Sequence, residues 1–421
     1  MGYTIDDDKE GYMRNCLVAQ SGGPTAAINS SLAGVLEGAM TSGEFKTVYG
    51  ALHGVQGLLN KEIINLSEKV NEIEGFIENL KHTPAMYLGS CRFMLPDASE
   101  DSEIYEKVVS IFDENEIDAF FYIGGNDSMD TVAKLSSYAK ENSIDVKVIG
   151  VPKTIDNDLY VTDHTPGYGS AAKFIATTLL EVGHDTSIYP IDSVTIVEIM
   201  GRDAGWLVGA AALARNKYNK APHLIYFPEV PVVESEFIAD VKDAIAKYHN
   251  VVIATSEGIK NPDGEYISST KAAEDKFAHS QLSGAAKVLE YMIKENIEVK
   301  VRSVEVNIPQ RTASHLQSLT DIEESFDEGA FAVTLALDGH TGEMVTIKRV
   351  SDEPYITHLS STDVNDAAGL VKHVPREWIN DRGNDVTEDF IKYAKPLIEG
   401  ETSINYKDGI PDYLDISHLE Q

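Results

Sequence analysis

One local pattern recurs in the first 160 residues: an apolar run followed at once by a turn of glycine or charged residues. The apolar runs are residues 16–20, 120–123 and 146–151, and helical patterns lie between them. Strands that alternate with helices form parallel sheets, because a parallel connection needs a long crossover. The pattern therefore predicts an α/β protein whose ligand crevice lies at the carboxyl ends of its strands.

The turn after residues 146–151 has the residue types that phosphate chemistry needs. It contains Lys153, Thr154, Asp156 and Asp158. A lysine can bind phosphate as a point charge, one carboxylate can accept a proton, and the other can hold Mg²⁺ through water. A charged turn that only caps the next helix could have the same composition. This turn alone leaves both interpretations open.

Two glycine turns strengthen the phosphate interpretation. Gly22 and Gly23 follow the first apolar run, and Gly125 precedes Asn126 and Asp127 after the second. Glycines expose backbone N–H groups, and the helix that begins at such a turn directs its positive end toward the same point. An amide or carboxylate oxygen at this place can also bind a Mg²⁺ that arrives with phosphate. Together the turns predict a phosphate site.

Several segments, in the same order along the chain, resemble the phosphofructokinase family. The segments are Ser-Gly-Gly at residues 21–23, Leu-Gly-Ser-Cys-Arg-Phe at 88–93, Gly-Gly-Asn-Asp-Ser at 124–128, Lys-Thr-Ile-Asp-Asn-Asp at 153–158, Glu-Ile-Met-Gly-Arg at 198–202, a strand ending in Glu257, and an arginine-containing strand ending in Gln-Arg at 302–311. The resemblance spans roughly residues 16–349 and implies a fold of two Rossmann-like lobes with mostly parallel sheets.

The resemblance also implies a division of the chain. A donor-binding lobe is expected at residues 12–165, with residues 312–350 returning to it, and a sugar-phosphate lobe at residues 166–311. Residues 351–421 are expected to form an irregular C-terminal extension, with a helix near residues 387–395. Within the first lobe, the glycine-rich residues 54–58 are predicted to form a turn.

The family transfers a phosphoryl group to the 1-hydroxyl of fructose 6-phosphate. Asp156 matches the family's general base, and Thr154 is expected to hold the transferring group. Asp158 is placed to support the metal or the base, and Arg202 and Lys153 are expected to neutralise charge on the phosphoryl oxygens. The implied cofactor is Mg²⁺.

The resemblance assigns the remaining residues to binding. The implied substrate-binding residues are Gly22, Gly23, Arg92, Gly125, Thr154, Ile155, Asp156, Met200, Gly201, Arg202, Glu257, Arg302 and Arg311. The two last arginines match residues that bind the sugar 6-phosphate, where a guanidinium suits phosphate geometry. The implied metal ligands are Asn126, Asp127 and Asp158.

The phosphoryl donor follows from Asp127 and Lys153. ATP-dependent members usually carry glycine at both positions, whereas this pair is typical of pyrophosphate-dependent members. A carboxylate near a nucleotide's α-phosphate repels it by about 4 kcal/mol at ~4 Å and an effective dielectric constant near 20. Alternatively, Asp127 points away and caps the helix. We therefore predict a pyrophosphate-dependent 6-phosphofructokinase activity, reversible as the family implies.

The sequence leaves two other functions open, and it departs from the family pattern at three places. The alternatives are an ATP-dependent enzyme and a catalytically silent regulatory subunit, although a silent subunit has no need of Asp156. Asn126 stands where many members have aspartate, Ser193 where many ATP enzymes have a phosphate-binding arginine, and Ile308-Pro309 where others have histidine or tyrosine before Gln-Arg. Sedoheptulose 7-phosphate therefore stays open as a substrate.

Composition excludes some partners. The net charge of −33 argues against binding to nucleic acid or to an anionic membrane surface. An anionic substrate then needs local clusters of lysine and arginine. The acidic start of the chain has no apolar signal segment, and its two cysteines fit a reducing compartment, so we expect a cytoplasmic enzyme. The family implies a homodimer or homotetramer, in which Arg302 matches an arginine that completes the sugar-phosphate site of a neighbouring subunit.

Overall fold

Strands and helices alternate along the computed structural model, which describes residues 15–268 and 284–420. The strands are β1 (Asn15–Gln20), β2 (Thr47–Ala51), β3 (Ile63–Asn65), β4 (Ile117–Gly124), β5 (Lys147–Pro152), β6 (Ser193–Ile199), β7 (Leu224–Tyr226), β8 (Asn250–Ser256), β9 (Lys300–Glu305), β10 (Glu343–Asp352), β11 (Tyr355–Asp363), β12 (Tyr406–Lys407) and β13 (Ile410–Pro411). The helices are α1 (Ile28–Ser42), α2 (Gly54–Leu59), α3 (Leu66–Glu72), α4 (Phe76–His82), α5 (Ser102–Glu114), α6 (Asn126–Glu141), α7 (Tyr168–Ser187), α8 (Trp206–Ala210), α9 (Glu234–Tyr248), α10 (Ala285–Asn296), α11 (Leu319–Leu337) and α12 (Glu388–Ala394). Residues 12–14 of the predicted first lobe lie outside the described residues.

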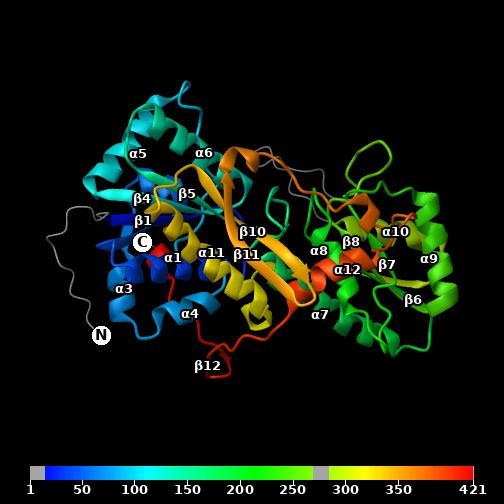
Figure 1. Ribbon diagram of the computed structural model, residues 1–421. Coiled ribbons are helices and arrows are strands. Elements are labelled where there is room, and N and C mark those ends of the chain that lie inside the picture. The colour runs from blue at the N-terminus through cyan, green and yellow to red at the C-terminus, as the bar shows by residue number, and fades with distance from the viewer. Residues whose placement is uncertain (1–14, 269–283, 421) are drawn as a thin grey trace.

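Two sheets organise these elements into two lobes (Figure 1). The sheet of the first lobe has seven strands in the order β11-β10-β5-β4-β1-β2-β3, and that of the second has four in the order β7-β8-β6-β9. β3 and β11 run antiparallel to their neighbours, whereas the other pairs in these sheets are parallel. The predicted α/β fold with mostly parallel sheets is confirmed.

Strand alternation builds the core of the first lobe. Cys16 and Val18 of β1 pack into a cluster with α1, α4 and α11, whereas Leu17 and Ala19 face α2, α5 and α6. Successive side chains of a strand point to opposite faces, so a strand covered on both faces is apolar throughout. β1 is buried at every residue, as its apolar run predicted.

The second lobe follows the same rule. Val197 and Ile199 of β6 pack with α7, α8 and α12, whereas Val194 and Ile196 pack with α9 and α10. α12 belongs to the C-terminal extension, so that extension helps to cover the second sheet. Within the described residues, no helix combines the length and the apolar character that a membrane crossing requires.

Two sequence-based expectations were wrong. Residues 54–58 form most of α2 rather than a turn, because their glycines permit close packing. A Cβ on Gly57 would lie 1.7 Å from the Leu52 carbonyl oxygen, and Gly54 adopts a φ of +59°.

The C-terminal extension, which was expected to be irregular, also begins with a regular strand, since β11 pairs with β10 along its length. β11 is a largely polar edge strand, which an apolar pattern cannot identify. The helix predicted near residues 387–395 is α12.

Buried ion pairs fix the crossing from the first lobe to the second. His164 is 2% exposed, and its ring nitrogens lie 2.8 Å from an Asp163 oxygen and 2.7 Å from a Glu324 oxygen. Arg349 of β10 pairs with Asp163 at 2.9 Å. Burial alone would lower the pKa of His164, but Glu324 and Asp163 reverse this effect and raise it to about 9. His164 is therefore a charged link between the crossing and α11.

This link predicts a pH-dependent stability. A histidine with a raised folded-state pKa stabilises fully below its unfolded value of 6.5, and the contribution is lost as the pH rises toward 9. The free energy of unfolding of the wild type, relative to His164→Gln, should fall by about 3 kcal/mol across that window. Denaturant unfolding at pH 6 and pH 9 measures it. A constant difference between the two proteins contradicts the assignment. His340→Gln, which alters an exposed ion pair with Glu343, is the control.

Candidate active site

A cavity of about 490 Å³ opens where the strands of both sheets end. Its walls come from the segments that follow β1, β4, β5, β6 and β8. Parallel strands that end at one edge bring distant parts of the sequence together there. The predicted residues that line the cavity are Gly22, Gly23, Arg92, Gly125, Asn126, Asp127, Lys153, Thr154, Ile155, Asp156, Asp158, Met200, Arg202, Glu257 and Arg311.

Two predicted residues lie elsewhere. Gly201 does not line the cavity, but its N–H donates at 3.3 Å to the carboxylate of Glu257, which does. Arg302 is on β9, the edge strand of the second sheet, and does not line the cavity of its own chain. Its Nε donates to the Thr195 hydroxyl at 3.2 Å, and its guanidinium lies 3.4 Å from Asp185. Within one chain, Arg302 therefore does not contribute to the cavity.

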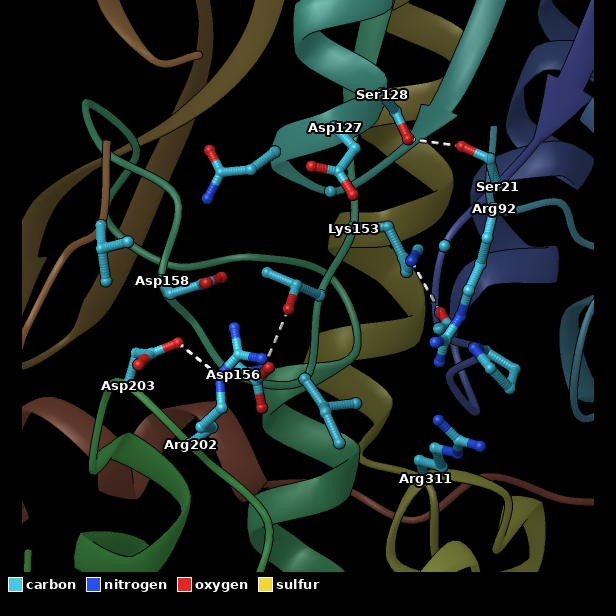
Figure 2. A pocket seen from close by; sticks show the side chains of 18 of the residues that line it. Ser21, Arg92, Asp127, Ser128, Lys153, Asp156, Asp158, Arg202, Asp203 and Arg311 are labelled. Carbon is cyan, nitrogen blue, oxygen red and sulfur yellow. Dashed lines mark hydrogen bonds and ion pairs between the residues drawn. The ribbon is translucent and has the colours of Figure 1, made fainter. Parts of the chain in front are cut away.

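The two glycine turns meet through serine hydroxyls. Ser21 and Ser128 hydrogen-bond to each other, which joins the turn after β1 to the start of α6 (Figure 2). A Cβ on Gly124 would lie 1.9 Å from the Ser128 hydroxyl, so glycine is required for this approach. The first residues of α6 consequently line the cavity together with the turn after β1.

A tight turn presents the two carboxylates of the segment after β5. The Asp156 N–H donates to the Thr154 hydroxyl at 3.1 Å, and Asn157 has a φ of +53°, which asparagine tolerates better than most residues. This turn brings Asp156 and Asp158 to the same cavity. Burial and the Asp158 charge raise the pKa of Asp156 to about 7, and burial also raises the pKa of Asp158.

Lys153 is the buried cation of the site. It is 2% exposed, and its Nζ donates to the Gly23 carbonyl at 2.7 Å. Burial lowers the pKa of Lys153 to about 8, although Asp156, Asp158 and Asp127 raise it in opposition. The field of Asp127 therefore reaches Lys153. A buried ammonium that lines a cavity can gain stability from a bound anion.

Two arginines line the cavity on the side away from Asp158 and Asp203 (Figure 2). Burial and the nearby Arg92 lower the pKa of Arg311. Arg311 Nε is buried and has no hydrogen-bond partner among the described residues. Two guanidinium groups near each other, one with an open donor, favour an anionic ligand such as phosphate.

The sequence did not identify Asp203, Gly369 or Val371 as parts of the site. Asp203 lines the cavity, and its carboxylate accepts a hydrogen bond from Arg202 Nε at 2.7 Å. Its position directly after the Met-Gly-Arg segment could have pointed to it. Gly369 and Val371 line the cavity from the C-terminal extension. No motif marks them, because only the path of the chain brings them there.

The oxygen groups of the cavity suit a magnesium ion. Asn126 Oδ1 is buried without a hydrogen-bond partner in the described part of the chain, and the carboxylates of Asp127 and Asp158 line the same cavity. Amide and carboxylate oxygens are the ligands that Mg²⁺ takes in proteins. Among the described residues, however, no three His, Cys, Asp or Glu side chains are grouped as a ready metal site. An ion carried in by phosphate fits this arrangement, since Mg²⁺ commonly keeps few protein ligands.

Comparisons with known proteins agree with this geometry. Residues 15–318 match the family described as Phosphofructokinase. A pyrophosphate–fructose 6-phosphate 1-phosphotransferase from Halomonas elongata is 39% identical over 400 residues, which cover 94% of each chain. A protein of the same name from Methylococcus capsulatus is 35% identical over 96% of each chain. The structure of a pyrophosphate-dependent phosphofructokinase from Nitrosospira multiformis superimposes with a TM-score of 0.86, 35% identity and 95% coverage of each chain.

Proposed function

Because this chain belongs to the phosphofructokinase family, we propose that it transfers a phosphoryl group from pyrophosphate to the 1-hydroxyl of fructose 6-phosphate. The products are fructose 1,6-bisphosphate and phosphate, and the reaction is reversible. One observation carries the proposal: Asp127, Lys153 and Asp156 line one cavity. The similarity to the named phosphotransferases extends over nearly the whole chain and supports it.

Asp156 acts as the general base. The sugar hydroxyl is a poor nucleophile, and a carboxylate within hydrogen-bond reach removes its proton as the bond to phosphorus forms. In the reverse direction the same carboxyl group returns the proton. A pKa of Asp156 near 7 suits both directions, because each protonation state is accessible at neutral pH.

Thr154, Lys153 and Arg202 stabilise the transferring group. The Thr154 hydroxyl lies in the turn that carries Asp156, so one short segment both orients the group and activates its acceptor. Lys153 and Arg202 provide positive charge where negative charge accumulates on the phosphoryl oxygens. Asp203 holds the Arg202 guanidinium before the substrates bind.

Asp127 and Lys153 select the donor. Asp127 lies in the first turn of α6 and lines the cavity, which supports an orientation toward the donor rather than away from it. The carboxylate repels the α-phosphate of a nucleotide, whereas the buried ammonium attracts pyrophosphate. Mg²⁺ is the cofactor, with Asn126, Asp127 and Asp158 as the residues that would hold it. When bound, it neutralises charge on the pyrophosphate oxygens.

The sugar phosphate binds at the other end of the cavity. Met200 and Glu257 hold the sugar, Gly201 supports Glu257 through its N–H, and Arg311 binds the 6-phosphate with Arg92 nearby. These groups come from residues 166–311, except Arg92, while the donor groups come from residues 12–165. Ser193 and Ile308-Pro309 leave sedoheptulose 7-phosphate as an acceptor to be tested beside fructose 6-phosphate. The enzyme acts in the cytoplasm, in keeping with its two free cysteines.

Arg302 serves the cavity of a neighbouring subunit. It lies on an edge strand outside its own cavity, and its side chain is 38% exposed. The family resemblance assigns it to a phosphate contact across a subunit boundary. The enzyme is therefore a homodimer or homotetramer whose sites are completed in pairs.

The first prediction concerns the donor. With fructose 6-phosphate and Mg²⁺, pyrophosphate should support turnover and ATP far less. Asp127→Gly should raise ATP use and lower pyrophosphate use, because it removes the repelling carboxylate. Asp130→Ala, one turn further along α6 and paired with Lys134, should keep the wild-type donor ratio. A preference of the wild type for ATP contradicts the donor assignment.

The second prediction concerns the base. Asp156→Ala should lower kcat at least ~10²-fold with little change in substrate binding, since general base catalysis contributes at least this factor. Steady-state kinetics and isothermal titration measure the two effects separately. Asp145→Ala, near the start of β5, alters an exposed ion pair with Lys147 and should change neither. A near-normal kcat in folded Asp156→Ala enzyme refutes the assignment.

The third prediction concerns subunit sharing. Arg302→Ala removes a charge-assisted phosphate contact that contributes about 1.5–3 kcal/mol. Mixing it with Asp156→Ala should restore activity, because one site of a mixed dimer holds both intact groups. Each variant mixed with itself is the control. Full activity of a strictly monomeric wild type, or no recovery after confirmed subunit exchange, shows that Arg302 does not act across subunits.

A further inference from the structure

Residues 369–373 of the C-terminal extension contact the catalytic turn, which is the turn after β5 that carries Asp156 and Asp158. Gly369 and Val371 line the cavity, and the next residue, Lys372, donates its backbone N–H to the Asp158 carbonyl at 2.8 Å. The chain then continues to the second lobe, where the His373 ring contacts the Asp203 carbonyl at 2.9 Å. One short segment of the extension therefore contacts both lobes beside the proposed catalytic groups.

The Lys372 side chain binds the same turn. Its Nζ donates to Asn157 Oδ1 at 3.3 Å and to the carbonyl oxygens of Thr162 at 3.2 Å and Asp163 at 2.8 Å. The ammonium also lies 5.3 Å from the centre of the Trp206 ring. An ammonium has three donors, and these three acceptors match that number. Lys372 therefore ties together both ends of the loop between the catalytic turn and the lobe crossing.

Tyr393 of α12 completes the contact. Its hydroxyl accepts a hydrogen bond from Asn157 Nδ2 at 2.8 Å and donates to the Asp163 carbonyl at 2.8 Å. The ring is nearly buried and packs against Trp206, with ring centres 5.1 Å apart. Tyr393 is consequently held rigidly, and its hydroxyl is available only to this loop.

Asn157 is the point on which these contacts converge. It is fully buried, has a φ of +53°, and lies between Asp156 and Asp158. Besides Lys372, its Oδ1 accepts the Thr165 N–H at 3.1 Å, and its Nδ2 is satisfied by Tyr393. A rotation of this residue would move both neighbouring carboxylates, because the backbone connects them directly.

We propose that Lys372 and Tyr393 form a clamp on Asn157 that positions Asp156 and Asp158 for phosphoryl transfer. Both are positioning residues, since they act through Asn157 rather than on substrate. This inference rests on the proposed function and assigns the C-terminal extension a part in it. Reacting groups displaced by about 1 Å can lose on the order of 10²-fold in rate, so the effect belongs in kcat. Arg311 and Glu257, which bind the sugar end, do not contact the clamp.

The test compares two clamp variants with two matched controls. Lys372→Met and Tyr393→Phe remove the polar contacts while keeping most of the side-chain volume. Lys348→Met removes a lysine that donates to the Val161 carbonyl in the same loop, and Tyr355→Phe removes a hydroxyl that donates to Glu324. Neither control residue contacts Asn157 through these bonds. Lys372→Met should lower kcat at least ~10-fold and Tyr393→Phe about 3-fold, with both KM values within about twofold of the wild type. The controls should match the wild type.

Hydrogen–deuterium exchange provides a measurement that does not depend on turnover. Peptides covering residues 154–165 should exchange faster in both clamp variants than in the wild type and the controls. Unchanged exchange, an unchanged kcat, or an equal loss in the controls overturns the clamp. A rise in both KM values in parallel with the fall in kcat also overturns it, because general loosening explains that result. A wild type without activity toward fructose 6-phosphate refutes the proposed function instead, and exchange still decides whether the clamp exists.

Discussion

The structure depends on the partial burial of the highly charged segment between β5 and α7. Between β5 and α7 the chain places Lys153, Asp156, Asp158, Asp163 and His164 within a dozen residues; Lys153 and His164 are buried, and the three aspartates are partly buried. Buried charges are costly unless other groups compensate them. Here the compensation comes from separate elements: Glu324 on α11, Arg349 on β10 and Lys372 in the C-terminal extension. Each of these partners lies at least 160 positions further along the chain, so the charges are compensated only once the tertiary structure has formed.

The same burial sets the ionisation of the proposed catalytic groups. It lowers the pKa of Lys153 and raises that of Asp156, because burial disfavours the charged form of each group. An arriving phosphate favours the charged form of Lys153. The chain has a net charge of −33, yet its cavity gathers Arg92, Lys153 and Arg311 on its walls. These cations face the carboxylates of Asp127, Asp156, Asp158, Asp203 and Glu257 across the same cavity, so positive charge for an anionic group is local to the arginines and Lys153.

The C-terminal extension contacts both lobes along its length. β11 widens the first sheet, and α12 packs on the second. The final residues return to the first lobe, where the Leu414 N–H donates to the Thr83 hydroxyl at 3.1 Å. Figure 1 shows β10 and β11 reaching from the first lobe toward α12, and Asp352 pairs with Lys392 of α12 at 3.1 Å. Such contacts limit the relative motion of the lobes and keep the cavity walls in register.

The sequence by itself determined the fold class, and its family resemblance named every charged residue that lines the cavity except Asp203. Apolar runs such as residues 16–20 indicate strands that are buried on both faces of a sheet. Glycine-rich or charged turns after such strands indicate a ligand site at the carboxyl edge of the sheet. It missed α2, whose glycines allow close packing, and β11, whose polar side chains give no apolar signal. Only the tertiary structure brought Lys372 and Tyr393 to Asn157. Those contacts join residues more than 200 positions apart, and no local periodicity or spacing encodes which distant side chains will meet.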